Sequence, residues 1–170
     1  MVLDDALEGD GRTFTGLTDE QIQEILENLA LTYGLSPTQE QVLNYALHKV
    51  GCAYSQAYHT NLTADIFDCS SLAYRSYKQT GIDIAYQGSY VAAAECKGLE
   101  EMGKIVTATS ELKPGDLIFY GGTSNGRHKG VYHVAIYCGD GKMVEARGKK
   151  YGVIYTDVRT PHIVSLCRPW

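Results

Sequence analysis

The chain has 170 residues, of which 44% are hydrophobic and 21% are charged, the proportions of a soluble globular protein with a sizeable core. Its 15 basic and 20 acidic residues give a net charge of −5, which argues against a nucleic-acid partner. Five cysteines form no C-x-x-C pair, so neither a disulfide framework nor a zinc ribbon is expected. No apolar run reaches membrane-spanning length, and we expect no membrane insertion.

The first 35 residues divide into a polar lead-in and a helix. Residues 1–16 are acidic and contain glycines, so we expect a flexible lead-in or the end of a linker. Apolar residues then recur at helical spacing, which predicts a helix over 18–33 that ends at Gly34. Its stripe is expected to pack against the core, and consists of Ile22, Ile25, Leu26, Leu29, Ala30 and Tyr33.

A second helix has a clear start signal. Ser36 suits the cap, Pro37 the first helical position and Gln39 the partner position of a capping box, and the helix is expected to stop at Gly51. We expect 17–170 to form a single domain, in which 17–35 add an N-terminal helix to a core spanning 36–170.

The segment Ile66–Leu72 places Cys69 where a third helix begins. Residues 70–80 lack proline and glycine, and Gly81 follows at the expected stop. Unpaired N–H groups and the positive end of the helix dipole would stabilise a thiolate there, as a nucleophile requires. A small buried structural cysteine is the alternative interpretation.

The second half of the chain favours an antiparallel sheet. A helical patch is expected over 90–101, followed by strands at 117–120, 131–138, 142–146, 151–155 and 163–167. A glycine-rich loop over 121–130 is expected to be mobile. Helices that precede a meandering sheet indicate the α+β class.

The hairpin around 139–141 carries His133 on one strand and Glu145 on the next. A three-residue turn with Gly141 in a left-handed conformation pairs Glu145 with Ala135, on the face of His133 and about 7–8 Å away diagonally. A two-residue turn would send Glu145 to the other face, so we predict the longer turn. The pair would then be the base and orienting half of a triad, although a lone strand histidine is often structural.

Three motifs carry a family resemblance. They are F-D-C-S-S-L at 67–72, L-K-P-G-D-L-I-F at 112–119 and H-V-A-I-Y-C-G-D-G-K-M-V-E-A at 133–146. In order and spacing they resemble the NlpC family (NlpC/p-sixty) of bacterial cell-wall cysteine peptidases. The resemblance implies a papain-like α+β fold with N-terminal helices packed on a central antiparallel sheet. It also implies cleavage of peptidoglycan stem peptides between D-γ-glutamate and meso-diaminopimelate or lysine.

Carried over by position, the resemblance makes Cys69 the nucleophile, His133 the base and acid, and Glu145 the orienting residue. Tyr54 would donate its hydroxyl to the oxyanion beside the Cys69 N–H. A carboxylate beside His133 favours the imidazolium, and an imidazolium favours a Cys69 thiolate. No metal or organic cofactor is required.

The chain also departs from the family pattern. Glu145 stands where histidine is usual, and Ser71 replaces a glycine. The Tyr-x-x-Gly-Gly pattern expected after Tyr54 is absent, so the cleft wall is expected to differ.

The sequence motifs name the three triad residues directly, whereas for substrate binding they give only a segment and candidate residues. The segment 86–91 is expected to line the stem-peptide pocket, with Gln87 and Ser89 as candidates. Asp68 and Ser70 are assigned chiefly to the turn and helix cap, with contact to substrate as a second role.

Other functions are weighed against the peptidase. They are a non-catalytic wall-binding module on the same fold, a thiol acyltransferase, and a metal site at Cys69, His133 and Glu145, for which no fourth ligand is found. We expect a monomer whose partner is the stem peptide. Because the N-terminus lacks a signal pattern, an extracellular or cell-wall location implies export within a longer protein, or a phage or mobile-element source.

Overall fold

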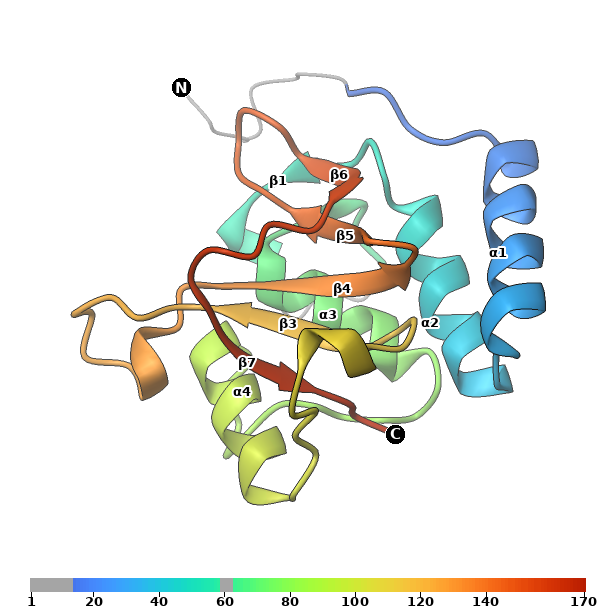
Figure 1. Ribbon diagram of the computed structural model, residues 1–170. Helices are drawn as coiled ribbons and strands as arrows, with labels where there is room; N and C mark the ends of the chain where they lie inside the picture. The colour runs from blue at the N-terminus through green and yellow to red at the C-terminus, as the bar shows by residue number, and fades with distance from the viewer. Residues whose placement is uncertain (1–13, 59–62) are drawn as a thin grey trace.

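A five-stranded antiparallel β-sheet lies at the centre of the molecule, and α-helices pack against one of its faces (Figure 1). The computed structural model describes residues 14–58 and 63–170. The strand order is β6-β5-β4-β3-β7. The strands are β3 (Leu117–Tyr120), β4 (His133–Gly139), β5 (Lys142–Ala146), β6 (Val153–Asp157) and β7 (Ile163–Cys167). This architecture confirms the predicted α+β class.

The first two helices begin where they were predicted, and Ser36 is the expected cap of the second. Thr18 precedes α1 (Asp19–Tyr33) and Ser36 precedes α2 (Pro37–His48), and each residue forms a capping box with a glutamine three residues later. The helix α2 ends at His48, short of the expected stop at Gly51. The remaining helices are α3 (Cys69–Lys78) and α4 (Ala92–Glu101).

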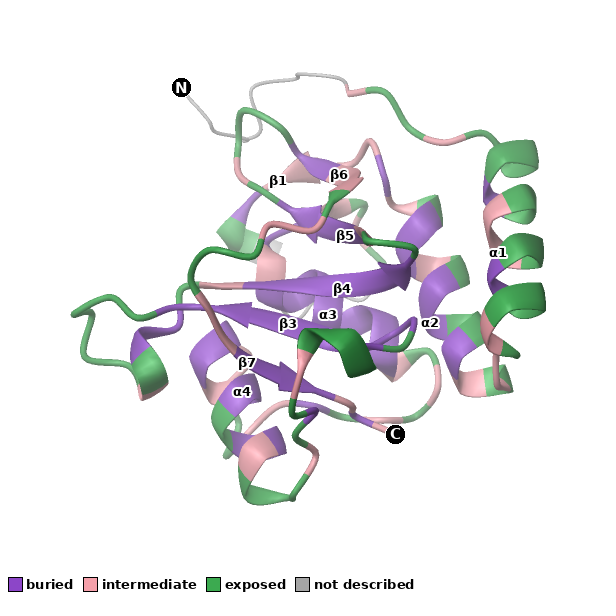
Figure 2. Ribbon diagram, in the orientation of Figure 1, coloured by how far each residue is buried: buried purple, intermediate pink, exposed green. Residues whose placement is uncertain are grey.

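The two faces of the sheet have different coverings. Val134, Ile136 and Val144 face the main core, which the four helices of the described residues share. Ala135 and Met143 face a smaller core, covered by the segments around Val106 and Leu112 and by the connection before β7. Figure 2 shows β3 and β4 buried along most of their length, whereas the outer side of α1 is exposed. The alternation of faces along β4 follows the period of an extended strand.

A small parallel pair of strands, which the sequence did not predict, lies outside the main sheet. The strand β1 (Ala53–Tyr54) pairs with β2 (Ile66–Phe67), with Tyr54 opposite Phe67. The segment was expected to be a loop; it also contains the short 3₁₀ helix η1 (Gln56–Tyr58). The pairing brings Tyr54 next to the residues that precede α3.

The hairpin between β4 and β5 has the predicted register but a different turn. Asp140 and Gly141 form a two-residue turn with φ of 53° and 73°, closed by the pair Gly139–Lys142. A bulge between Tyr137 and Gly139 then shifts the register by one residue. Ile136 consequently pairs with Val144, and Glu145 follows on the face of His133. The predicted three-residue turn is wrong, whereas the face that it implied and the left-handed Gly141 are confirmed.

Other expectations concern the chain ends and loops. Residues 1–13 of the expected lead-in lie outside the described part, whereas Gly16 approaches Gly51 so closely that a Cβ on Gly51 would lie 2.9 Å from the Gly16 Cα. The loop over 121–130 contains η3 (His128–Gly130), and its backbone is held by Thr123 and Asn125 side chains. Within residues 14–58 and 63–170, no helix is both long and apolar enough to cross a membrane.

Candidate active site

Cys69 is the first residue of α3 and lies in a cleft at that end of the helix. Asp68 caps the helix: its Oδ1 accepts a hydrogen bond of 2.8 Å from the Ser71 N–H, and Ser71 Oγ accepts one from the Asp68 N–H. Cys69 is half-buried, and the cleft beside it has a volume of about 240 Å³. The residues lining this cleft are Tyr54, Gln56, Asp68, Cys69, Ser70, Val91, Ala92, Arg127 and Tyr132.

Two features of the site oppose the Cys69 thiolate that the helix end was expected to stabilise. Burial first, and then the neighbouring Asp68 carboxylate, raise the pKa of Cys69 to about 12. The backbone N–H groups of Val134 and Ser70 lower the pKa only in part. Asp68 adds to the effect of burial because its carboxylate already occupies the positive end of the helix that the thiolate would use.

His133 is the first residue of β4, and its ring is held by Glu145 on β5. The His133 Nε2 lies 2.6 Å from Glu145 Oε1, and the two residues stem from the neighbouring strands that the hairpin joins. The backbone N–H of Val134, the residue after His133, is the group that reaches the Cys69 sulfur. Cys69 therefore lies against the start of the strand that carries His133.

The Glu145 carboxylate is fully buried and has a second partner, Arg159. The guanidinium donates two hydrogen bonds, from Nη1 to Oε2 at 2.6 Å and from Nη2 to Oε1 at 2.7 Å. Burial alone would raise the pKa of Glu145, but hydrogen bonds from Arg159 and then from His133 outweigh it and lower the pKa to about 2. Glu145 is therefore a fixed anion whose charge Arg159 balances.

Tyr54 lines the same cleft as Cys69, as the resemblance implied. Its hydroxyl is protonated, because burial raises the pKa of Tyr54 well above its ordinary value and the nearby Cys69 and Asp68 raise it further. A protonated phenol can donate a hydrogen bond to a negatively charged oxygen in the cleft.

The four predicted substrate-binding residues separate into two places. Asp68 and Ser70 line the Cys69 cleft. Gln87 and Ser89 lie instead in a neighbouring hollow with Lys97, and Arg127 lines both hollows. Val91 of the expected 86–91 segment, rather than these two polar residues, reaches the cleft itself.

A third hollow lies on the other side of Tyr132. It has a volume of about 420 Å³ and includes His133, Tyr120 and Arg159 among its lining residues. Tyr132, which is 47% exposed, lines this hollow and the Cys69 cleft alike. The two hollows therefore meet at Tyr132, with Cys69 lining one and His133 lining the other.

Three residues of this site were missed by the sequence reasoning. Arg159 precedes β7 in an irregular segment, and nothing local links it to Glu145. Arg127 lies in the glycine-rich loop, and Tyr132 precedes the histidine motif. The one available signal was the Glu145 carboxylate on a strand, since a buried anion requires a cation or further hydrogen-bond donors. This signal could have predicted a partner such as Arg159, but not which residue supplies it.

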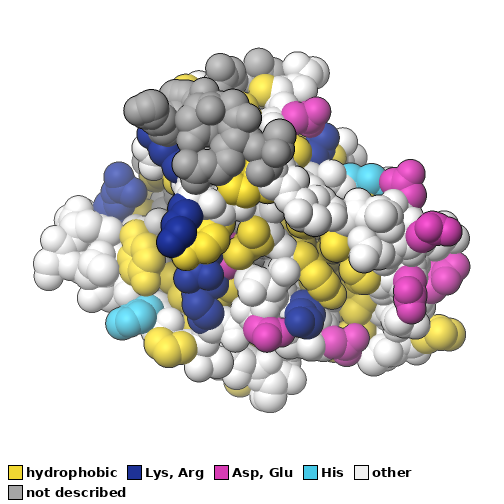
Figure 3. Space-filling view, turned by 90° about the horizontal axis from the view of Figure 1, so that it is seen from above, with side chains coloured by type: hydrophobic (Ala, Val, Ile, Leu, Met, Phe, Trp, Pro, Cys, Tyr) yellow, Lys and Arg dark blue, Asp and Glu magenta, His cyan; other side chains and the backbone are white. Residues whose placement is uncertain are grey.

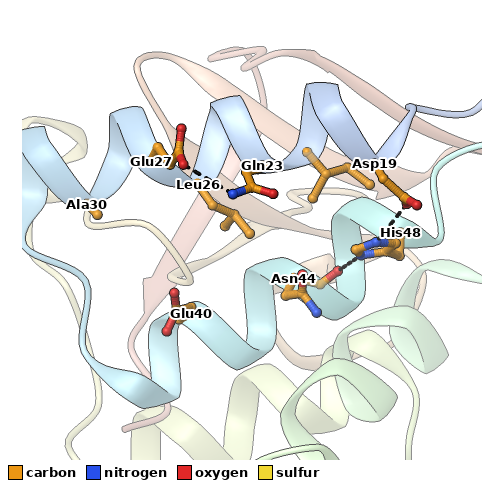
Figure 4. A pocket seen from close by; sticks show the side chains of 9 residues that line it. Asp19, Gln23, Leu26, Glu27, Ala30, Glu40, Asn44 and His48 are labelled. Carbon is orange, nitrogen blue, oxygen red and sulfur yellow. Dashed lines mark hydrogen bonds and ion pairs between the residues drawn. The ribbon is translucent and has the colours of Figure 1, made fainter.

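A larger hollow between α1 and α2 lies away from Cys69. Its volume is about 430 Å³, and Figure 4 shows its lining, in which Asp19 pairs with His48 and Gln23 with Glu27. Figure 3 shows acidic side chains gathered at the end of the molecule where α1 lies. The lining contains neither a cysteine nor a serine, so the Cys69 cleft is the candidate active site.

Comparison with known proteins identifies the family of this chain. Residues 54–166 match the sequence profile of the NlpC/P60 family. The chain is 30% identical over 146 residues to the bifunctional muramidase/DL-endopeptidase CwlT of Bacillus subtilis, covering 84% of this chain and 40% of that protein. It is 28% identical over 167 residues to the peptidoglycan endopeptidase RipA of Mycobacterium tuberculosis, covering 89% of this chain and 32% of that protein. The chain thus spans less than half the length of these relatives.

Solved structures share the fold. NlpC2 from Trichomonas vaginalis superposes with a TM-score of 0.62 at 27% identity, covering 78% of this chain and 46% of that chain. RipD from Mycobacterium tuberculosis, a non-catalytic NlpC/p60 domain protein, superposes with a TM-score of 0.60 at 24% identity and covers 80% of this chain and 100% of that chain. The fold is thus that of the papain-like cysteine peptidases. Within this class, the chain belongs to the NlpC/P60 family.

Proposed function

We propose that this protein is a peptidoglycan hydrolase, a cysteine endopeptidase that cleaves stem peptides at the bond between D-γ-glutamate and meso-diaminopimelate or lysine. The observation that carries the proposal is the placement of Cys69 at a helix N-terminus in an open cleft, against the strand whose first residue, His133, is held by Glu145. The names of the relatives support the substrate, since one is a gamma-D-glutamyl-L-lysine dipeptidyl-peptidase of Bacillus cereus, 31% identical over 96 residues.

In the proposed reaction, the Cys69 sulfur attacks the scissile carbonyl while its proton passes to His133. The proton must move during the attack, because the raised pKa of Cys69 disfavours a preformed thiolate. Glu145 occupies the Nε2 side of the ring, which leaves Nδ1 to exchange the proton with sulfur. Tyr54 and the Cys69 N–H donate to the oxyanion.

The tetrahedral intermediate then collapses, the carbon–nitrogen bond breaks, and His133 returns its proton to the leaving amine. Water enters, gives a proton to His133 and attacks the acyl carbon, and the thiol is released with the acid product. Arg159 keeps Glu145 ionised throughout, so that the carboxylate orients the ring without taking its proton.

Charge in the cleft suits an acidic stem peptide. Arg127 is a cation in the lining of the cleft, and Lys97 lies in the hollow that Arg127 shares. A free carboxylate on the substrate would be attracted to this side, although the chain as a whole is acidic.

Digestion of purified peptidoglycan, followed by mass spectrometry of the released fragments, tests the proposal. We expect fragments that end at D-γ-glutamate and new amino groups on the diamino acid. Cys69→Ala should abolish them, with Cys138→Ala as the matched control because Cys138 is a buried cysteine of β4 away from the cleft. Cleavage that persists in Cys69→Ala would refute the cysteine mechanism.

A wall-binding module without catalysis is the second candidate, favoured by the non-catalytic relative that shares the fold. The two are separated by a pull-down with insoluble peptidoglycan alongside the digestion. Binding without any released fragment would establish the module. We further propose that the protein acts as a monomer at the cell wall, which light scattering of the purified chain would test.

A further inference from the structure

A second group of metal-ligating side chains lies outside the active site, where α4, η3 and β7 meet. The Cys96 sulfur, a Glu100 carboxylate oxygen and a His128 ring nitrogen all lie within 4.8 Å of one another. Cys96 and Glu100 are one helical turn apart on α4, so their side chains share a face. We name this group, together with Cys167 of β7, the α4 cluster.

The fourth member, Cys167, completes a set of donors. Its thiol is within hydrogen-bonding reach of Cys96, and its sulfur lies 3.7 Å from the Ser165 hydroxyl. Ser165 in turn donates a hydrogen bond of 2.5 Å to Glu100. Cys167 and Cys96 are fully buried, and both are free thiols.

We propose that the α4 cluster is a binding site for a thiophilic divalent cation of the Zn²⁺ type, held by Cys96, Glu100, His128 and Cys167. Two sulfurs, an imidazole and a carboxylate are ligands that Zn²⁺ takes in tetrahedral sites. Bond lengths of about 2.0 to 2.3 Å place such ligand atoms about 3.3 to 3.8 Å apart. Cys96, Glu100 and His128, whose ligand atoms lie within 4.8 Å of one another, need only small side-chain shifts to reach these separations. Cys167, which lies beside Cys96, would have to turn toward the same point.

A cationic side chain already lies beside Glu100, so a metal ion would have to replace it. The Lys129 ammonium is 2.7 Å from Glu100 Oε2, while Cys96 Sγ is 3.6 Å from the same oxygen. The Lys129 side chain is 43% exposed and that of His128 28%, so the cluster opens to solvent on their side. An incoming metal ion can therefore displace the flexible lysine without unfolding the surrounding helix.

The site would also fix the wall of the active-site cleft. His128 belongs to η3, which packs on α4, and its neighbour Arg127 lines the Cys69 cleft. A metal bond from His128 to α4 would hold this loop in place. The binding itself, however, is independent of the proposed peptidase activity.

Titration of the reduced, chelator-treated chain with Co²⁺ tests the site, and Zn²⁺ then competes for it. The titration uses the Cys69→Ala variant, so that the thiol of the proposed active site cannot bind the metal. We expect one equivalent of Co²⁺ with the visible bands of a tetrahedral site and a thiolate charge-transfer band, and a higher melting temperature with Zn²⁺. No stoichiometric binding would overturn the proposal.

Variants assign the ligands. His128→Ala, at the solvent side of the cluster, should weaken binding by more than about 100-fold, the upper end of what loss of an outer-shell partner costs. His162→Ala, an exposed histidine on another segment, and Cys138→Ser should bind as the parent does. Lys129→Met should bind more tightly, a gain that damage to the fold would not produce.

Two outcomes would refute the ligand set. Undiminished binding in His128→Ala would place the metal elsewhere. If the metal-free chain bound no Co²⁺ and mass spectrometry after air exposure showed Cys96 joined to Cys167, the pair would be a disulfide element and the metal site would be wrong.

Discussion

The chain carries two groups built from the same residue types, and their geometry differs. Cys69, His133 and Glu145 form the proposed catalytic group, in which Glu145 binds one ring nitrogen of His133 and leaves the other for the proposed proton transfer. In the α4 cluster, the corresponding atoms of cysteine, glutamate and histidine converge within 4.8 Å. A proton relay requires groups in line, whereas a cation requires donors around one point. The comparison shows that residue types alone do not define the chemistry of a site.

The two glutamates are also balanced differently. Glu145 is fully buried and takes a bidentate guanidinium, whereas Glu100 is 11% exposed and takes a lysine, a histidine and a serine. Burial opposes ionisation in both, yet hydrogen bonds lower the pKa of each carboxyl to about 2. Both glutamates are therefore anions. Glu145 is enclosed with Arg159, whereas the Lys129 partner of Glu100 is open to solvent.

The largest effect is expected from His133→Ala. Without the base, the thiol of Cys69 cannot lose its proton during attack, so kcat/KM should fall by about 10⁵- to 10⁶-fold. His48→Ala, on the surface of α2, is the matched control. Steady-state hydrolysis of a stem peptide measures both, and a loss of less than tenfold in His133→Ala would remove the catalytic group from the mechanism.

A smaller loss is expected from Glu145→Gln. The amide cannot stabilise an imidazolium and leaves Arg159 without its anion, so kcat/KM should fall by about 10³- to 10⁴-fold. Glu27→Gln, on exposed α1, controls for the loss of one charge, and circular dichroism checks the fold. Unchanged activity with an unchanged pH profile would show that Glu145 has no orienting role.

Arg159→Met sharpens the role of the counter-charge. The Glu145 anion would then face His133 without a competing cation and hold a proton on the ring more strongly. The acid limb of kcat/KM should therefore move to higher pH, with a loss of about tenfold near neutrality. Arg147→Met, which stacks on the exposed Tyr151, is the control; an identical shift in both variants would exclude a specific effect of Arg159.

For Glu95, which is fully buried like Glu145, we expect an effect on stability alone. Neither of its carboxylate oxygens has a hydrogen-bond partner among the described residues, and burial, then Asp68 and Asp83, raise the pKa of Glu95 well above 4.5. In the unfolded chain the Glu95 carboxyl loses its proton above about pH 4.5, whereas in the folded chain it keeps it. The free energy of unfolding therefore falls as the pH rises through that value.

Glu95→Gln should remove this penalty. We expect a melting temperature several degrees higher at pH 7.5 and little change at pH 4, measured by calorimetry at both values. A stabilisation that is equal at the two pH values would contradict a protonated Glu95, and Glu24→Gln on exposed α1 controls for net charge.

Much of this protein is determined by local sequence. The capping box at Ser36 and the strand alternation around His133 act over a few residues, and they were predicted in place. The face of Glu145 followed from its alternation with His133, even though the turn that sets the register was predicted wrongly. Motifs at 67–72 and 133–146 were sufficient to indicate the family.

Tertiary structure decided what depends on burial and on distant charges. Arg159 reaches Glu145 from a distant segment of the chain, and the pairing of β1 with β2 brings Tyr54 beside Cys69. Cys167 of β7 likewise lies next to Cys96 of α4. The raised pKa of Cys69 likewise follows from desolvation and from the Asp68 cap, which its position at the helix start does not reveal. Electrostatic energies depend on the dielectric and the distances in space, which neighbouring letters of a sequence do not specify.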